Sequence, residues 1–254
     1  MPSPRISVII NCKNGEIFLE EVFTALKKQK FKDFEVIFLD SGSVDGSKKI
    51  FDRYKEDNYF YVEGNENDSL AESRNKAVKK SRGEWLCFND QDDIYLSERF
   101  SDPMKIAEKD TDLKLIFSDF EKIDINSKSL GSGSFGKCSF SNVLLGIANV
   151  GLLTLTVKRD CFDSLGGFDE RYPHSQDYHL ILKIIKKHKF HYIDKVLAKY
   201  RIHNKSMSSQ MLSDGSLYLE TAKIAMNYLP RPEAVFRVVE MYSKYLYRKF
   251  FRKK

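Results

Sequence analysis

The chain has 254 residues, a formal net charge of +6 at pH 7 and four cysteines. This length allows one large domain, or a domain with an appendage, to bury a core without a disulfide or a structural metal. The cysteines form no CxxC pair and no zinc-ligand pattern, so the sequence excludes a zinc module and favours reduced thiols. Residues 1–5 lead directly into an apolar run, and no apolar stretch is long enough to cross a bilayer, so we expect a cytoplasmic protein without a signal peptide.

Strands and helices alternate through the first part of the chain. Apolar runs at residues 6–10, 36–39, 59–62 and 85–88 predict buried strands. Apolar residues at helical spacing predict helices from Glu16 to Leu26, through Ile50 and Tyr54, and over residues 70–80. This alternation predicts an α/β fold, with a mostly parallel sheet and helices on both of its faces.

The second part of the chain is less regular. The sequence predicts further strands at residues 113–117 and 152–157, a flexible Gly/Ser-rich loop at 129–136, a turn at 166–169 and a helix around 178–185. After a loop near residues 204–214, it predicts helices broken at Pro230 and Pro232. We therefore predict one α/β domain over residues 1–210 and a basic, helical extension over residues 211–254.

Three polar loops leave strands at the same edge of the predicted sheet, where α/β proteins bind ligands. They are residues 11–15, 40–47 and 89–94. The third loop contains Asp90, Asp92 and Asp93, whose like charges repel unless a cation neutralises them, and oxygen ligands suit Mg²⁺ or Mn²⁺. A solvated acidic turn, with Asp93 capping the next helix, explains the same residues, and the spacing alone favours neither interpretation.

Further motifs separate these alternatives. Seven segments carry such motifs, and they are residues 7–15, 34–47, 73–85, 90–93, 166–170, 176–178 and 200–203. Each is weak alone, but the ordered set resembles the family 2 glycosyltransferases of bacterial polysaccharide and lipopolysaccharide synthesis, which have the GT-A fold. The resemblance implies a GT-A-like (Rossmann-like) catalytic domain. It also implies an inverting, metal-dependent transfer of a hexosyl or N-acetylhexosaminyl group from a nucleotide-diphosphate donor to a saccharide or lipid-linked saccharide acceptor.

The resemblance assigns a role to each polar loop. The residues that would line or face the nucleotide pocket are Asn11, Lys13, Asp40, Ser41 and Arg74. Asp90 and Asp92 take the places of the DXD motif, with Asp92 as the ligand of Mn²⁺ or Mg²⁺ and Asp90 nearer the ribose and diphosphate. His203 would contact the diphosphate or complete the metal shell. A UDP-sugar is the expected donor. This sequence departs from the family at two positions, where Lys13 replaces a frequent aromatic residue and Ser41 a frequent aspartate. Considered alone, Arg74 is more simply an exposed helical arginine.

Glycosyl transfer needs a base that removes a proton from the acceptor hydroxyl, and a carboxylate suits this task. Asp177 begins an apolar helix and matches the base motif of the family, although a helix cap explains the same position without chemistry. His179 stands where the family often has a second acidic residue, and it either shapes acceptor preference or is an exposed helical histidine. The resemblance implies no enzyme nucleophile, which fits a single displacement with inversion.

The C-terminal residues predict a helix with one apolar face, formed by Val235, Val238, Val239, Tyr242 and Leu246, and with a basic end. This helix either lies on the inner face of the cell membrane or packs on the domain. We expect no nucleic-acid partner, because no recognised binding module is present.

Two other functions fit parts of the sequence. A catalytically silent protein that binds nucleotide sugars, or serves as a scaffold, would explain the changes at Lys13 and Ser41. A phosphatase or phosphotransferase would use Asp40, which follows an apolar strand, as its nucleophile. Gly42, however, occupies the place of the second aspartate that such enzymes have.

Overall fold

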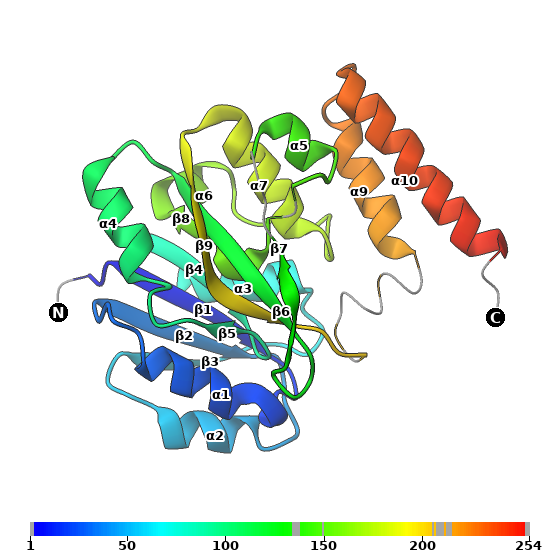
Figure 1. Cartoon of the computed structure of the whole chain (residues 1–254). Coiled ribbons are helices and arrows are strands. Elements are labelled where there is room, and N and C mark those ends of the chain that lie inside the picture. Colours follow the sequence, from blue (N-terminus) through cyan, green and yellow to red (C-terminus); the bar gives the residue numbers. More distant parts are fainter. Residues whose placement is uncertain are drawn as a thin grey trace.

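The computed structural model describes residues 3–133, 138–148, 150–204, 206, 211 and 215–251. Within this part of the chain, nine strands form one sheet at the centre of the molecule (Figure 1). The strands are β1 (Ile6–Cys12), β2 (Phe34–Asp40), β3 (Tyr59–Glu63), β4 (Trp85–Asp90), β5 (Ile94–Tyr95), β6 (Leu115–Ile123), β7 (Ser129–Gly133), β8 (Thr156–Lys158) and β9 (Phe190–Arg201). Their order is β3-β2-β1-β4-β8-β6-β9-β5, and β7 pairs with β6.

The first half of the sheet is parallel and the second half is mixed. β1 runs parallel to β2 and β4, and β2 runs parallel to β3. β8 is antiparallel to both β4 and β6, whereas β9 runs parallel to β6 and pairs antiparallel with the short β5. This mixed sheet with flanking helices confirms the predicted fold class.

Helices cover both faces of the sheet, because alternate strand residues point to opposite sides. In β1, Val8 and Ile10 belong to the core shared with α1 (Glu16–Lys27), α2 (Ser47–Tyr54) and α4 (Ser101–Lys109). Ile9 belongs to the opposite core, which includes α3 (Leu70–Lys79), α6 (Arg159–Ser164) and α7 (Gln176–Lys187). β1 and β2 are buried on both faces, which explains their continuous apolar runs.

The C-terminal helices α9 (Ser216–Met226) and α10 (Pro232–Phe251) lie side by side and reach the domain through α5 (Phe140–Leu144) (Figure 1). The rings of Phe140 and Tyr228 meet edge to face with their centroids 5.2 Å apart. The Ser141 hydroxyl donates a hydrogen bond of 2.8 Å to Glu233, and Ala234 joins the core on the α7 side of the sheet. These contacts attach the extension to the domain.

No helix of the described residues is long and apolar enough to span a membrane.

Two stretches differ from the predicted elements. Residues 129–133 form β7 instead of a loop, because their backbone pairs with β6. The remainder of that predicted loop, residues 134–136, lies outside the described residues, as does most of the loop predicted near 204–214. Residues 152–154 form the 3₁₀ helix η1 (Leu152–Thr154), and the strand predicted there begins only at Thr156.

Candidate active site

The carboxyl ends of β1, β2 and β4 meet at one edge of the sheet. Strand pairing places Asn11 beside Asp90 and Cys12 beside Asp40. Asn11 is 7% exposed, and neither polar atom of its side-chain amide has a hydrogen-bond partner among the described residues. Buried amides are normally paired, so Asn11 has both a donor and an acceptor to offer to a ligand.

Asp40 orders the second loop. Its Oδ1 accepts a hydrogen bond of 2.8 Å from the Ser43 amide, and its Oδ2 accepts one of 2.9 Å from the Tyr61 hydroxyl. A phosphoryl nucleophile needs a free oxygen facing its substrate. Because Asp40 is buried with both oxygens engaged, the structure does not support the phosphotransferase interpretation.

Lys13 and Ser41 lie beside the same edge, and each contacts a neighbouring segment. The Lys13 ammonium donates to the Glu66 carbonyl at 3.1 Å, and the Lys13 amide donates to the Gln91 side chain at 2.7 Å. The Ser41 hydroxyl lies 3.4 Å from that of Ser73. Gln91, to which the sequence assigned no role, therefore joins the first loop to the acidic loop.

Arg74 is buried and paired, so its interpretation as an exposed helical arginine is wrong. Its Nη2 donates to Asp90 Oδ1 at 2.5 Å, and only 4% of its side chain is exposed. The start of α3 is fixed by a capping box, in which Ser69 and Glu72 each accept a hydrogen bond from the backbone amide of the other. The remaining guanidinium donors suit a phosphate next to Asp90.

Asp92 and His203 lie 111 residues apart in the sequence and meet with 2.8 Å between Oδ2 and Nε2. Burial and the neighbouring Asp90 raise the pKa of Asp92, while the contact with His203 lowers it. A cation would relieve the repulsion between these carboxylates. Among the described residues, no group of three or more His, Cys, Asp or Glu side chains is arranged to hold a metal. Asp92 and His203 together present one oxygen and one nitrogen, so an ion held by them would need its other ligands from phosphates or water.

Asp93 does not cap a helix, and that prediction is wrong. The residues after it form β5, and its Oδ1 accepts a hydrogen bond of 2.9 Å from the Arg201 amide. Burial, with the charges of Asp92 and Asp90, holds the pKa of Asp93 well above its usual range. Arg201 also donates to the Asp92 carbonyl at 2.9 Å and to Glu21 at 2.8 Å. Arg201, which the sequence left without a role, thus joins the acidic loop to the end of β9.

Asp177 lies in the first turn of α7, where its Oδ1 accepts a hydrogen bond of 2.8 Å from the Tyr178 amide. The N-cap position belongs to Ser175, so Asp177 is not the helix cap. Burial raises the pKa of Asp177, Arg74 counteracts this shift, and Asp90 adds to it. A carboxylate with a raised pKa is a stronger base, which suits the removal of a proton from a hydroxyl.

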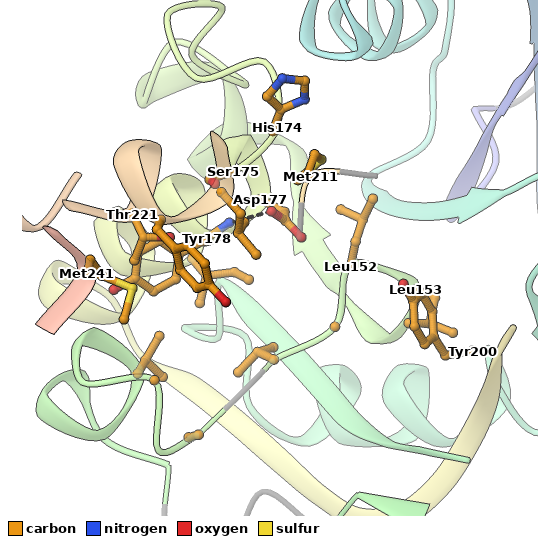
Figure 2. A pocket seen from close by; sticks show the side chains of 18 of the residues that line it. Leu152, Leu153, His174, Ser175, Asp177, Tyr178, Tyr200, Met211, Thr221 and Met241 are labelled. Carbon is orange, nitrogen blue, oxygen red and sulfur yellow. Dashed lines mark hydrogen bonds between the residues drawn. The ribbon is translucent and has the colours of Figure 1, made fainter. Parts of the chain in front are cut away.

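Asp177, Arg74 and Asp90 line one cavity of about 930 Å³. Its walls come from η1, α7, α9 and α10, among other segments, and Figure 2 shows Leu152, Asp177, Thr221 and Met241 as examples. Away from Asp177 and Arg74 most of the lining is aliphatic or aromatic. The C-terminal helices therefore form one side of the cavity that contains the candidate base.

Glu220 of α9 contacts the segment just before Asp177. Its Oε2 accepts hydrogen bonds from the amides of His174 at 3.1 Å and Ser175 at 2.9 Å. The Glu220 side chain is largely buried, so these bonds are shielded from water. Glu220 therefore holds the backbone from which α7 and Asp177 begin, a role that no local sequence pattern indicated.

His179 does not line the cavity. It is 7% exposed and packs on the ring of Tyr172, with centroids 4.7 Å apart, while its Nδ1 lies 3.7 Å from Asp169. Burial lowers the pKa of His179 to about 4. Its interpretation as an exposed helical histidine is therefore wrong, and its role in acceptor preference stays a prediction.

Known proteins resemble this chain in sequence. The family described as Glycosyl transferase family 2 matches residues 7–144. An uncharacterized glycosyltransferase of Methanocaldococcus jannaschii is 30% identical over 226 residues, 86% of this chain and 78% of the relative. The UDP-Glc:alpha-D-GlcNAc-diphosphoundecaprenol beta-1,3-glucosyltransferase WfgD of Escherichia coli is 24% identical over 211 residues, 82% of this chain and 81% of WfgD. The chain belongs to glycosyl transferase family 2 and is a glycosyltransferase, which confirms the predicted family and class of enzyme.

Two solved structures share the fold. TarS 1–349 of S. aureus, in complex with UDP-GlcNAc, has a TM-score of 0.74 at 20% identity, covering 97% of this chain and 72% of TarS. The mannosyltransferase PcManGT of Pyrobaculum calidifontis, in complex with GDP-Man and Mn²⁺, has a TM-score of 0.70 at 16% identity, covering 99% of this chain and 71% of PcManGT. Both likenesses confirm a GT-A-like fold.

Proposed function

We propose that the protein transfers a sugar from a nucleoside-diphosphate donor to a saccharide acceptor in a single, metal-assisted displacement that inverts the anomeric carbon. One observation supports this most: Asp90 of the acidic loop and Asp177 line the same cavity. They are close enough for the charge of Asp90 to raise the pKa of Asp177. A sugar between them would have its diphosphate beside the acidic loop and an attacking hydroxyl beside Asp177.

The strand-end loops would hold the donor. Asn11 offers a buried amide to the nucleotide, and Arg74, next to Asp90, offers guanidinium donors to the diphosphate. Lys13, Asp40 and Ser41 would complete the pocket. UDP is the proposed nucleotide, because TarS is a fold neighbour in complex with UDP-GlcNAc and the name of WfgD includes UDP-Glc. The transferred group would then be a hexosyl or N-acetylhexosaminyl group.

Asp92 and His203 would hold a divalent cation. A carboxylate oxygen with an imidazole nitrogen suits Mn²⁺, with Mg²⁺ as the alternative, and the fold neighbour PcManGT is in complex with Mn²⁺. When bound, the ion offsets the negative charge that develops on the departing diphosphate. Arg201 supports this arrangement, because it bonds the backbone of Asp92 and lies two residues before His203.

Asp177 would act as the base. It takes the proton of the acceptor hydroxyl while the hydroxyl oxygen forms a bond to the anomeric carbon, and the bond to the diphosphate breaks on the opposite side. A lipid-linked saccharide fits the apolar part of the cavity, and the name of WfgD includes a sugar linked to diphosphoundecaprenol. We place this reaction in the cytoplasm, at the inner face of the cell membrane. Residues 1–210 would form the catalytic domain, and residues 211–254 an extension that walls the acceptor site.

Calorimetric titration with a panel of nucleotide sugars, with and without Mn²⁺, tests this function. We expect one donor to bind in a Mn²⁺-dependent manner and to be hydrolysed slowly. Asp92→Asn should abolish the metal dependence of binding, whereas Asp177→Asn should keep binding and lose transfer. Asp163→Asn, an exposed carboxylate of α6 outside the cavity lining, is the matched control. Donor binding without hydrolysis or transfer, with saccharide and lipid-linked acceptors supplied, would instead indicate a silent binding protein.

A further inference from the structure

α10 has apolar side chains on two of its sides. One side packs against the rest of the protein through Ala234, Val238 and Met241. The other side, here called the apolar face, consists of Val235, Phe236, Val239, Leu246, Tyr247 and Phe250, each between 47% and 65% exposed. At 3.6 residues per turn these six positions fall on one side of the helix. Figure 1 shows α10 at the outer edge of the molecule, beyond α9. The single apolar face predicted for this helix is thus divided between packing and exposure.

The segment that contains the apolar face is strongly basic. Residues 211–254 have nine lysines and arginines against four aspartates and glutamates, whereas the whole chain has 42 against 36. On α10, Lys244 donates to Glu240 and Arg248 lies over the Tyr218 ring of α9, whereas the Lys249 ammonium lies 5.8 Å from the centroid of the Phe250 ring, within the apolar face. Cations beside exposed aromatic and aliphatic residues are typical of helices that lie in the interface of an anionic membrane. A second copy of the chain would instead bring like charges together.

The apolar face continues into the cavity that contains Asp177. Phe236 belongs to the face and also lines the cavity. Arg237, Glu240, Met241 and Lys244 line the cavity from the adjoining side of the same helix. A lipid surface in contact with the apolar face would therefore lie at the rim of the cavity.

We infer that α10 lies on an anionic membrane, with its apolar face in the lipid and its cations toward the headgroups, and that this contact brings the cavity to acceptors held in the membrane. The membrane contact depends on α10 alone. Its consequence for the acceptor rests on the proposed transferase function. Because the donor loops lie on other elements, hydrolysis of a water-soluble donor should not require the membrane.

Cosedimentation of the full-length protein with vesicles tests this inference. The wild type should pellet with phosphatidylcholine vesicles that contain phosphatidylglycerol, and much less with phosphatidylcholine alone. Replacing Val239, Leu246 and Phe250 by serine should weaken binding to the anionic vesicles about tenfold or more, because it removes apolar area from the lipid. None of the three lines the cavity, so Mn²⁺-dependent donor hydrolysis should stay at the wild-type rate and show that the variant is folded.

Charge variants separate headgroup attraction from general loss of charge. Lys249→Gln should weaken binding to the anionic vesicles about fivefold, because each cation near the surface contributes about 1 kcal/mol. Lys79→Gln, at an exposed lysine that ends α3, removes the same charge elsewhere and should have little effect. Equal effects of the two variants would overturn the proposed orientation of α10.

Further outcomes distinguish this inference from the transferase proposal. A wild-type protein that hydrolyses the donor but binds no vesicles, or a serine variant that binds them as well as the wild type does, would overturn the membrane contact alone. Vesicle binding without donor hydrolysis would overturn the transferase proposal alone. A wild-type dimer in analytical ultracentrifugation that dissociates in the serine variant, without vesicle binding, would assign the apolar face to self-association instead.

Discussion

Removing the Glu220 carboxylate tests whether the C-terminal extension positions the proposed base. Glu220→Ala deletes the hydrogen bonds of 3.1 and 2.9 Å from the His174 and Ser175 amides. A hydrogen bond to a charged group contributes about 1.5–3 kcal/mol, so the backbone before Asp177 loses about 3–6 kcal/mol of local stabilisation. A displacement of about 1 Å at a reacting group lowers a rate roughly 100-fold. We therefore expect kcat for sugar transfer to fall by roughly that factor.

The assay is kcat at saturating donor, together with calorimetric Kd for the donor in the presence of Mn²⁺. Donor affinity should stay within about twofold of the wild type, because the donor loops follow β1, β2 and β4, whereas Glu220 bonds the segment before α7. Glu220→Gln keeps an oxygen that accepts hydrogen bonds and should lose only about tenfold in kcat. Lys223→Ala, an exposed site on the same helix, is the control and should leave both constants unchanged. A folded Glu220→Ala protein with wild-type kcat would refute the positioning role, and so would a parallel fall in donor affinity.

Three further predictions concern single groups. Asn11→Leu should stabilise the ligand-free protein by about 1 kcal/mol in denaturant unfolding, because it removes a buried amide that has no partner within the described part of the chain. It should also weaken donor binding about tenfold in calorimetry, and unchanged affinity would contradict its place in the donor pocket. Because the pKa of Asp177 is raised, kcat/KM should fall with decreasing pH, with a midpoint at a pH above the ordinary pKa of aspartate. A midpoint at the ordinary pKa of aspartate would contradict its role as base. The pKa of His179 is lowered from 6.5 to about 4, so as the pH decreases the unfolded chain binds a proton at this residue before the folded protein does. The free energy of unfolding should therefore fall as the pH is lowered from 6.5 to about 4. An identical fall in His179→Phe would assign the effect to other groups.

The strands could be predicted where burial leaves a pattern. β1, β2 and β4 are covered on both faces and appear as continuous apolar runs. β9 lacks such a run, because most of its positions are exposed or partly exposed and they include Asp194 and Lys195. In β7, serines and glycines pair with β6 through backbone groups, which every residue type except proline offers in full. Composition therefore could not reveal these two strands.

The candidate site could be predicted where neighbouring strands bring loops together. Asn11, Asp40 and Asp90 end adjacent parallel strands, so their proximity follows from the alternation of strands and helices. The contacts of Arg201 with Asp93 and of Glu220 with Ser175 join residues 108 and 45 positions apart. In both contacts the donor is a backbone amide, which every residue except proline has. The local sequence therefore does not indicate either contact.

The anomer first released from the donor is the most direct test of a single displacement with Asp177 as the base. Water can replace the acceptor, so the experiment requires no known acceptor. The protein hydrolyses an α-linked UDP-sugar with Mn²⁺, and proton NMR records the released sugar before it mutarotates. We predict that the β anomer appears first, and that Asp177→Asn releases neither anomer at a measurable rate. Initial release of the α anomer would contradict the single displacement, and undiminished release by Asp177→Asn would contradict its role as base.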